Sequence, residues 1–154
     1  SAIVLAAGLS QRMGDKNKML LSFRNKTVIE SVVENILAAG IHEVIAVTGF
    51  EAERINALLK NLPVKIIYNS DYEKGMTTSI QAGVQAATGN GYMICLGDMV
   101  TITSDEYAFL KNKFEDCIQQ NEKCICIPLY KKTKGNPVKL QSILLEELEK
   151  LKKI

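Results

Sequence analysis

The sequence has little of what several large classes of protein require. Basic residues exceed acidic ones by only two charges over 154 residues, an excess too small to indicate nucleic acid or a membrane surface as the main partner. No apolar run approaches the roughly twenty residues of a membrane-spanning helix, and no repeat, low-complexity stretch or linker interrupts the chain. The single histidine, His42, has no partner motif, so we expect it at the surface or at a strand edge rather than in catalysis.

The remaining composition is that of a globular protein. Apolar residues make up 47% and charged residues 23% of the chain, a balance typical of folded soluble proteins. We therefore expect one domain over residues 1–154 with a single core. Residues 1–5 are apolar and no charged leader precedes them, which favours a cytoplasmic protein.

Cysteines in that compartment are expected to be reduced thiols. The chain has four of them, Cys95, Cys117, Cys124 and Cys126. Cys124 and Cys126 fall in an apolar run typical of a strand, and we expect them to pack in the core and not to hold a metal together.

Apolar runs alternate with amphipathic segments along the chain. Continuous or β-branched apolar runs, typical of buried parallel strands, lie at 1–5, 44–48, 64–68 and 92–96, and further strands are expected at 124–130 and 138–140. Apolar residues at helical spacing mark the segments 27–39, 51–61, 77–87, 103–119 and a last helix around 143–151. Thr27 with Glu30 and Thr103 with Glu106 form capping boxes at two helix starts. The alternation predicts an α/β fold, with a three-layer, mostly parallel Rossmann-like sheet and helices on both faces.

Ligands of such sheets bind beyond the carboxyl ends of the strands. Three loops at such ends carry the unusual residues of this chain, namely 6–18, 69–76 and 97–101.

The loop at 6–18 combines small residues with fixed positive charge. Ala6, Ala7 and Gly8 allow the backbone to approach a ligand closely, so that its N–H and C=O groups can contact a base or ribose. Arg12 and Lys18 add two cations near that backbone, as a triphosphate requires.

The spacing of this loop matches neither common phosphate-binding motif. Asp15 follows Gly14 where a Walker A loop has lysine, and Ser10 stands where Gly-x-Gly-x-x-Gly has its second glycine. From residue types alone, a glycine-containing surface turn with two solvated cations is an open alternative.

The loop at 97–101 supplies a carboxylate. Asp98 follows the apolar run at 92–96 and Gly97, so its side chain is expected in the crevice beyond the strand. A hard oxygen ligand there suits Mg²⁺, which takes one or two carboxylates together with substrate phosphates. The alternative is an aspartate that caps the segment after it.

The remaining candidates are polar or small residues in the loop at 69–76, the helix after it and one basic turn. Asn69, Gly75 and Ser79 are placed to contact a nucleotide, although Asn69 could equally form a turn. Gly83, on the same helix face as Ser79, could line the ligand or allow a close helix–sheet contact. The turn 131–136 is basic and ends at Asn136, which suits an anionic acceptor or an ordinary solvated turn.

Four stretches together resemble the MobA-like nucleotidyltransferases, closest to the molybdenum cofactor cytidylyltransferase branch. They are Leu5-Ala6-Ala7-Gly8-Leu9-Ser10-Gln11-Arg12-Met13-Gly14 with Lys18, Gly75-Met76 with Ser79-Ile80 and Gly83, Leu96-Gly97-Asp98-Met99, and Gly135-Asn136-Pro137-Val138. The resemblance implies a fold of the nucleotide-diphospho-sugar transferase type. It also implies that Arg12, Lys18 and Asp98 are catalytic, with Mg²⁺ on Asp98 and the acceptor near Asn136. The nucleotide would contact Leu5, Ala6, Ala7, Gly8, Arg12, Lys18, Asn69, Gly75 and Ser79.

The same resemblance implies CTP as donor and molybdopterin as acceptor. Ala7 contributes to this expectation, because the guanylyl branch tends to carry glycine there. Val100 departs from the family by replacing a proline, which affects only local stiffness, and the family's later Gly-Asp-x-Gly segment does not occur within residues 1–154.

No nucleophilic Ser, Cys or His constellation is evident, and none is needed if the acceptor's own phosphate oxygen attacks the α-phosphorus and expels pyrophosphate. Two other functions stay open at this point. One is a guanylyltransferase, or a transferase for a sugar or alcohol phosphate. The other is a nucleotide-binding regulatory module without turnover.

Overall fold

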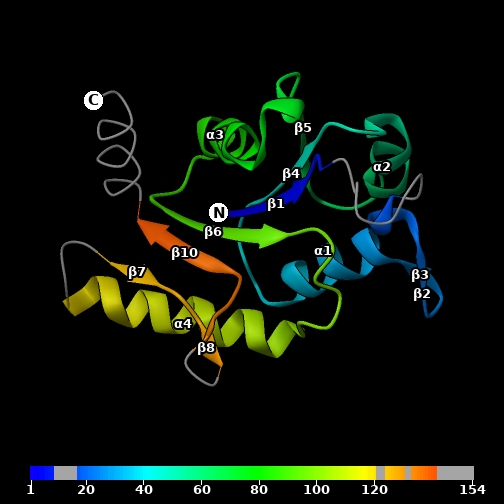
Figure 1. Ribbon diagram of the computed structural model, residues 1–154. Helices are drawn as coiled ribbons and strands as arrows, with labels where there is room; N and C mark the ends of the chain where they lie inside the picture. Colours follow the sequence, from blue (N-terminus) through cyan, green and yellow to red (C-terminus); the bar gives the residue numbers. More distant parts are fainter. Residues whose placement is uncertain (9–16, 121–123, 131–132, 142–154) are drawn as a thin grey trace.

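The computed structural model describes residues 1–8, 17–120, 124–130 and 133–141 (Figure 1). The described elements are β1 (Ala2–Ala6), η2 (Lys18–Leu20), β2 (Ser22–Phe23), β3 (Lys26–Thr27), α1 (Val28–Ala38), β4 (Val44–Thr48), α2 (Ala52–Leu59), β5 (Lys65–Tyr68), η3 (Tyr72–Lys74), α3 (Met76–Ala86), β6 (Gly91–Leu96), α4 (Ser104–Gln120), β7 (Ile125–Cys126), β8 (Leu129–Tyr130), β9 (Thr133–Lys134) and β10 (Val138–Gln141). The helix expected around 143–151 lies outside the described residues. Among the helices of the described part, none is long and apolar enough to cross a membrane.

A six-stranded sheet forms the centre of the molecule, in the order β5-β4-β1-β6-β10-β7. The four strands from β5 to β6 are parallel, whereas β10 runs antiparallel to both of its neighbours. The predicted three-layer, mostly parallel sheet is thus confirmed, and β10 with β7 extends it as an antiparallel edge.

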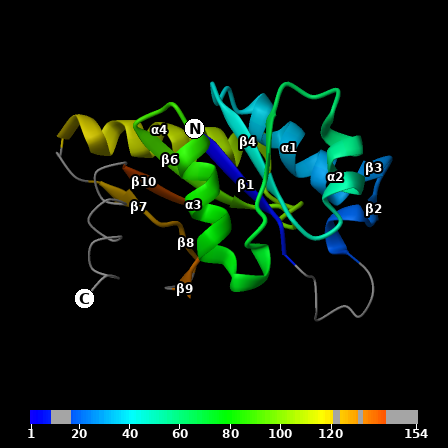
Figure 2. The same cartoon turned by 90° about the horizontal axis from the view of Figure 1, so that it is seen from above.

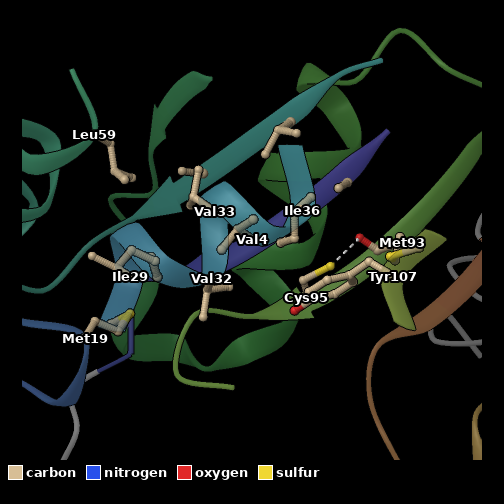
Figure 3. Packing of buried hydrophobic residues seen from close by; sticks show 14 of the residues in the cluster. Val4, Met19, Ile29, Val32, Val33, Ile36, Leu59, Met93, Cys95 and Tyr107 are labelled. Carbon is tan, nitrogen blue, oxygen red and sulfur yellow. Dashed lines mark hydrogen bonds between the residues drawn. The ribbon is translucent and has the colours of Figure 1, made fainter. Parts of the chain in front are cut away.

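Side chains alternate between the two faces of β1 and build two cores. Ala2, Val4 and Ala6 pack in the cluster with residues of α1, α2 and α4, and Figure 3 shows Val4 there beside Ile29, Val32 and Ile36 of α1. Ile3 and Leu5 belong to the other cluster, which packs against α3. Both faces of β1 are buried, as expected of a central parallel strand. Figures 1 and 2 show α3 on one side of the sheet and α1 and α4 on the other.

Both predicted capping boxes are present, and the one at α1 leads to a stability prediction. Glu30 N donates to Thr27 Oγ1 at 3.4 Å, and Thr27 N donates to Glu30 Oε2 at 2.9 Å. The hydrogen bond from the Thr27 side chain, and then that from its backbone, holds the pKa of Glu30 below its ordinary value. The box therefore contributes stability above the ordinary glutamate pKa and loses it as the pH falls through the lowered one.

We expect Thr27→Ala to lower the free energy of unfolding by about 1 kcal/mol at pH 7, and by less at an acid pH below the lowered pKa of Glu30. Denaturant unfolding at the two pH values measures this. The exposed Thr101, replaced by alanine, serves as the control. An effect of Thr27→Ala that is no larger than that of the control would show that the box does not stabilise α1.

Two expectations about the second half of the chain need correction. The strand expected at 124–130 is divided into β7 and β8. Pro128 lies between them and has no N–H to donate to a strand ladder, while its carbonyl accepts a 2.8 Å hydrogen bond from Gly135 N. The chain thereby leaves the sheet and forms the β8–β9 hairpin.

The cysteines are also not all reduced thiols. Cys117 and Cys124 form a disulfide, with a Cα–Cα distance of 6.2 Å, which is within the range that a bridge can span. The sequence did not indicate it because the pairing depends on the packing of α4 against the edge strand β7.

Candidate active site

The order of the strands reverses between β1 and β6, and such a reversal predicts a crevice beyond the ends of these two strands. From β1 the chain passes through α1 to β4 and through α2 to β5, always away from β6. It then returns through α3 to β6, on the other side of β1. Such a reversal is a topological switch point, where open α/β sheets bind ligands beyond the carboxyl ends of their strands. Residues 7–8 and 97–98 follow the two strands that flank this point.

Gly97 joins the ends of the two strands. Its N–H donates a 3.0 Å hydrogen bond to the carbonyl of Leu5. A Cβ at position 97 would lie 2.9 Å from that same carbonyl oxygen and 2.9 Å from Sδ of Met19. Only glycine allows this close approach, and it sets the next residue, Asp98, directly beyond the end of β1.

The carboxylate of Asp98 is exposed at this position. Within the described part of the chain no hydrogen bond or ion pair to it is found. The alternative that Asp98 caps the following segment has no support, since Thr103 provides the cap of α4 through its reciprocal hydrogen bonds with Glu106. A solvent-facing, uncommitted carboxylate at the mouth of the crevice fits an Mg²⁺ ligand.

The first loop has one open residue at the edge of the crevice. Leu5, Ala6 and Ala7 are buried, and the carbonyl of Ala7 accepts a 3.3 Å hydrogen bond from Phe50 N. Gly8 is exposed, and a Cβ built there meets no atom of the described chain within 4 Å. Gly8 is thus the residue of this group whose backbone faces open space, while the other three form the floor under it.

The methyl group of Ala7 packs away from that open space. A Cβ on Gly49, which follows β4, would lie 2.9 Å from Cβ of Ala7 and 2.6 Å from Cβ of Tyr72. The three residues therefore pack closely together beyond the carboxyl end of β4. Loss of water contact, together with the neighbouring Glu73, raises the pKa of the Tyr72 phenol. Neither Gly49 nor Tyr72 was indicated by the sequence, because the contact between them depends on the parallel pairing of β4 with β5.

Lys18 is placed at the same edge. It begins η2, whose start is fixed by Asn17: the Oδ1 of this buried side chain accepts a 3.1 Å hydrogen bond from Met19 N. Met19 is buried and meets Gly97, as described above, so η2 is anchored at the carboxyl end of β6. Arg12 lies outside the described residues. The buried Asn17 and Met19 were not predicted, although asparagine is a common residue at the N-cap of a helix.

Asn69 and Ser79 are buried and bonded to one another. Nδ2 of Asn69 donates to Oγ of Ser79 at 3.0 Å and to Oγ1 of Thr78 at 2.9 Å, and its Oδ1 accepts from Asp71 N at 3.0 Å. The turn-forming alternative for Asn69 is therefore present, and the side chain ties the end of β5 to the start of α3. In this arrangement the two residues position the start of α3, where the exposed Gly75, with a φ of 112°, is the N-cap.

Gly83 packs against the sheet, whereas Asn136 lies at the carboxyl end of β6. A Cβ on Gly83 would lie 2.3 Å from Cγ2 of Ile3, so Gly83 provides the close helix–sheet contact that was one of its two readings. Asn136 directly precedes Pro137 and β10, and β10 starts with Val138 opposite Ile94 of the antiparallel β6. Asn136 is therefore at the carboxyl end of β6, the same edge as Asp98.

A separate cavity of about 570 Å³ lies between the β2–β3 hairpin and residues 100–104. None of the predicted site residues that the structure describes lines it. Two of its charged side chains, Lys26 and Glu34, form an ion pair. The size of this cavity alone does not make it the active site, and the switch point, with its glycine backbone and open carboxylate, remains the candidate.

Comparison with known proteins gives the family of the chain. The profile of the MobA-like NTP transferase domain matches residues 2–153. The chain belongs to this family. Molybdenum cofactor cytidylyltransferase from Escherichia coli K12 is 31% identical over 137 residues, covering 88% of this chain and 67% of the relative. Nicotine blue oxidoreductase from Paenarthrobacter nicotinovorans is 37% identical over 99 residues, covering 64% of this chain and 48% of the relative.

A solved nucleotidyl transferase from Methanothermobacter has the same fold as this member of the MobA-like family. It superposes with a TM-score of 0.81 at 24% identity, covering 95% of this chain and 73% of that one. The chain matches about half the length of the Paenarthrobacter relative and about two thirds of the Escherichia coli one.

Proposed function

We propose that this chain transfers CMP from CTP to the phosphate of a molybdopterin acceptor, with release of pyrophosphate and with Mg²⁺ as cofactor. The observation that carries the proposal is the position of Gly8 and Asp98, which follow the two strands on either side of the β1–β6 switch point. It provides an open backbone on one side and an uncommitted carboxylate on the other. The resemblance to the cytidylyl branch supports the choice of CTP and of the acceptor, and a cytoplasmic location, where nucleoside triphosphates are made, goes with it.

The chemistry requires positioning more than a reactive side chain. An acceptor phosphate oxygen forms a bond to the α-phosphorus of CTP in line with the bond that breaks to the β-phosphate oxygen, and pyrophosphate leaves. Backbone groups at Gly8 hold the nucleotide, and Arg12 and Lys18 stabilise negative charge on the phosphates. Asp98 would hold Mg²⁺, which supplies further charge neutralisation. Asn136, at the same edge, contacts the acceptor.

Pyrophosphate release from each of the four common nucleoside triphosphates tests the proposal, with and without molybdopterin. We expect release only with both CTP and molybdopterin present. Faster release with GTP would assign the chain to the guanylyl branch, and release with a sugar or alcohol phosphate instead of molybdopterin would replace the acceptor. CTP binding without release in any combination would identify a nucleotide-binding regulatory module.

The charge at position 18 gives a separate prediction. Lys18→Ala should lower the rate of pyrophosphate release by more than about tenfold, because negative charge on the phosphates is stabilised most in the transition state. Lys60→Ala is the matched control, since it removes the same charge from the exposed end of α2. Equal rates for the two variants would mean that η2 has only a structural role.

A further inference from the structure

Three cysteine side chains meet where α4 ends beside the edge of the sheet. Cys117 lies in the last turn of α4, Cys124 directly precedes β7, and Cys126 belongs to β7. Cys117 and Cys124 are joined by the disulfide, and Sγ of Cys126 is 3.7 Å from Sγ of Cys124. All three sulfur atoms lie within 4.8 Å of one another.

The spacing of Cys124 and Cys126 does not support the expectation that they do not hold a metal together, because their sulfur atoms are 3.7 Å apart. Side chains along a strand alternate between its faces, so residues two positions apart point to the same face. Cys124 and Cys126 therefore face the same neighbour, which is α4. The third sulfur comes from Cys117, seven residues before Cys124.

The cluster lies at the opposite end of the sheet from the crevice. Within the ladder from β7 through β10 to β6, Cys126 is level with Met93, and Ile125 with Tyr92. Cys124 therefore adjoins the amino end of β6, whereas Asp98 follows its carboxyl end. The three cysteines are thus outside the nucleotide site, and the proposed transfer reaction does not use them.

We propose that, in the reduced protein, Cys117, Cys124 and Cys126 form a thiolate site for one soft divalent cation of the Zn²⁺ type. Thiolate sulfur is a preferred ligand of Zn²⁺, and with a Zn–S bond of about 2.3 Å two thiolates on a tetrahedral ion lie about 3.8 Å apart. The 3.7 Å between Cys124 and Cys126 matches that spacing. Three sulfurs leave the fourth tetrahedral position to water or to an external ligand.

The disulfide and the metal site exclude one another, because both use the sulfurs of Cys117 and Cys124. A phosphine reductant opens the disulfide by donating two electrons. One disulfide and one water yield two thiols, and the phosphine becomes a phosphine oxide. Binding of one Zn²⁺ then releases three protons from the three thiols. In either state the end of α4 remains linked to the edge strand β7.

Cobalt titration of the whole chain tests the site. We expect the phosphine-reduced, oxygen-free protein to bind one equivalent of Co²⁺ with sulfur-to-cobalt charge-transfer absorption, and Zn²⁺ to displace it. The untreated, disulfide-bonded protein should give no such absorption. Cys126→Ser keeps both disulfide partners but should weaken binding of Zn²⁺ by at least about tenfold. Cys95→Ala, which alters a thiol in the core on β6, should bind like the parent chain.

Two results would overturn the proposal. One is the absence of charge-transfer absorption in the reduced parent chain, and this outcome does not depend on how well any variant folds. The other is equal Zn²⁺ affinity of Cys126→Ser and the parent chain. Either would leave a disulfide with a neighbouring thiol and no metal site.

Discussion

Asp98→Asn is expected to lower pyrophosphate release by on the order of a hundredfold at a fixed Mg²⁺ concentration. The substitution keeps the shape of the side chain and removes the charge that binds the ion. The midpoint of thermal unfolding should stay the same, because the carboxylate is exposed and contacts no partner in the part of the chain that the structure describes.

Asp105→Asn provides the matched control. Asp105 is an exposed aspartate in the first turn of α4, so its loss changes the net charge equally without touching the crevice, and activity should be retained. Raising the Mg²⁺ concentration should recover part of the activity of Asp98→Asn but leave the control unchanged. Full activity of Asp98→Asn at ordinary Mg²⁺ would remove Asp98 from the site.

Gly97→Ala should have the second largest effect, on both stability and turnover. The added methyl group would lie 2.9 Å from the carbonyl oxygen of Leu5, and a backbone atom in the sheet cannot move aside as a flexible side chain can. We expect a loss of about 1–3 kcal/mol in the free energy of unfolding. The ends of β1 and β6 would also separate, and because displacement by about 1 Å can cost a hundredfold in rate, turnover should fall even in the folded fraction.

Gly8→Ala separates the two effects. A Cβ at this position meets no described atom within 4 Å, so the free energy of unfolding should not change. The methyl group would enter the space assigned to the nucleotide and should raise the KM for CTP. If Gly8→Ala has normal kinetics, the nucleotide does not bind beside Gly8, whatever the outcome for Gly97→Ala.

The sequence predicts best those structural features that depend on residues close together in the chain. The capping boxes at Thr27 and Thr103 involve residues three positions apart, and both are found. The location of Asp98 follows from one buried strand ending at a glycine, and it too was predictable. In both cases the relevant contacts are formed by neighbours in the chain or by the common edge of a parallel sheet.

Contacts between distant segments could not be read in the same way. Position 49 requires glycine because a Cβ there would clash with Tyr72, and this contact forms only when β4 and β5 are paired. The role of Asn69 depends on Ser79, which lies on the next helix. The disulfide depends on how α4 packs against β7. Short strands such as β2 and β3, two residues each, have too little periodicity to be recognised.

The most direct test of the central claim follows the fate of each phosphate of CTP. With molybdopterin and Mg²⁺, label placed on the α-phosphate should appear in the acceptor, and label placed on the γ-phosphate should appear only in pyrophosphate. Transfer of the γ-label to the acceptor, or its release as inorganic phosphate, would contradict nucleotidyl transfer at the β1–β6 crevice.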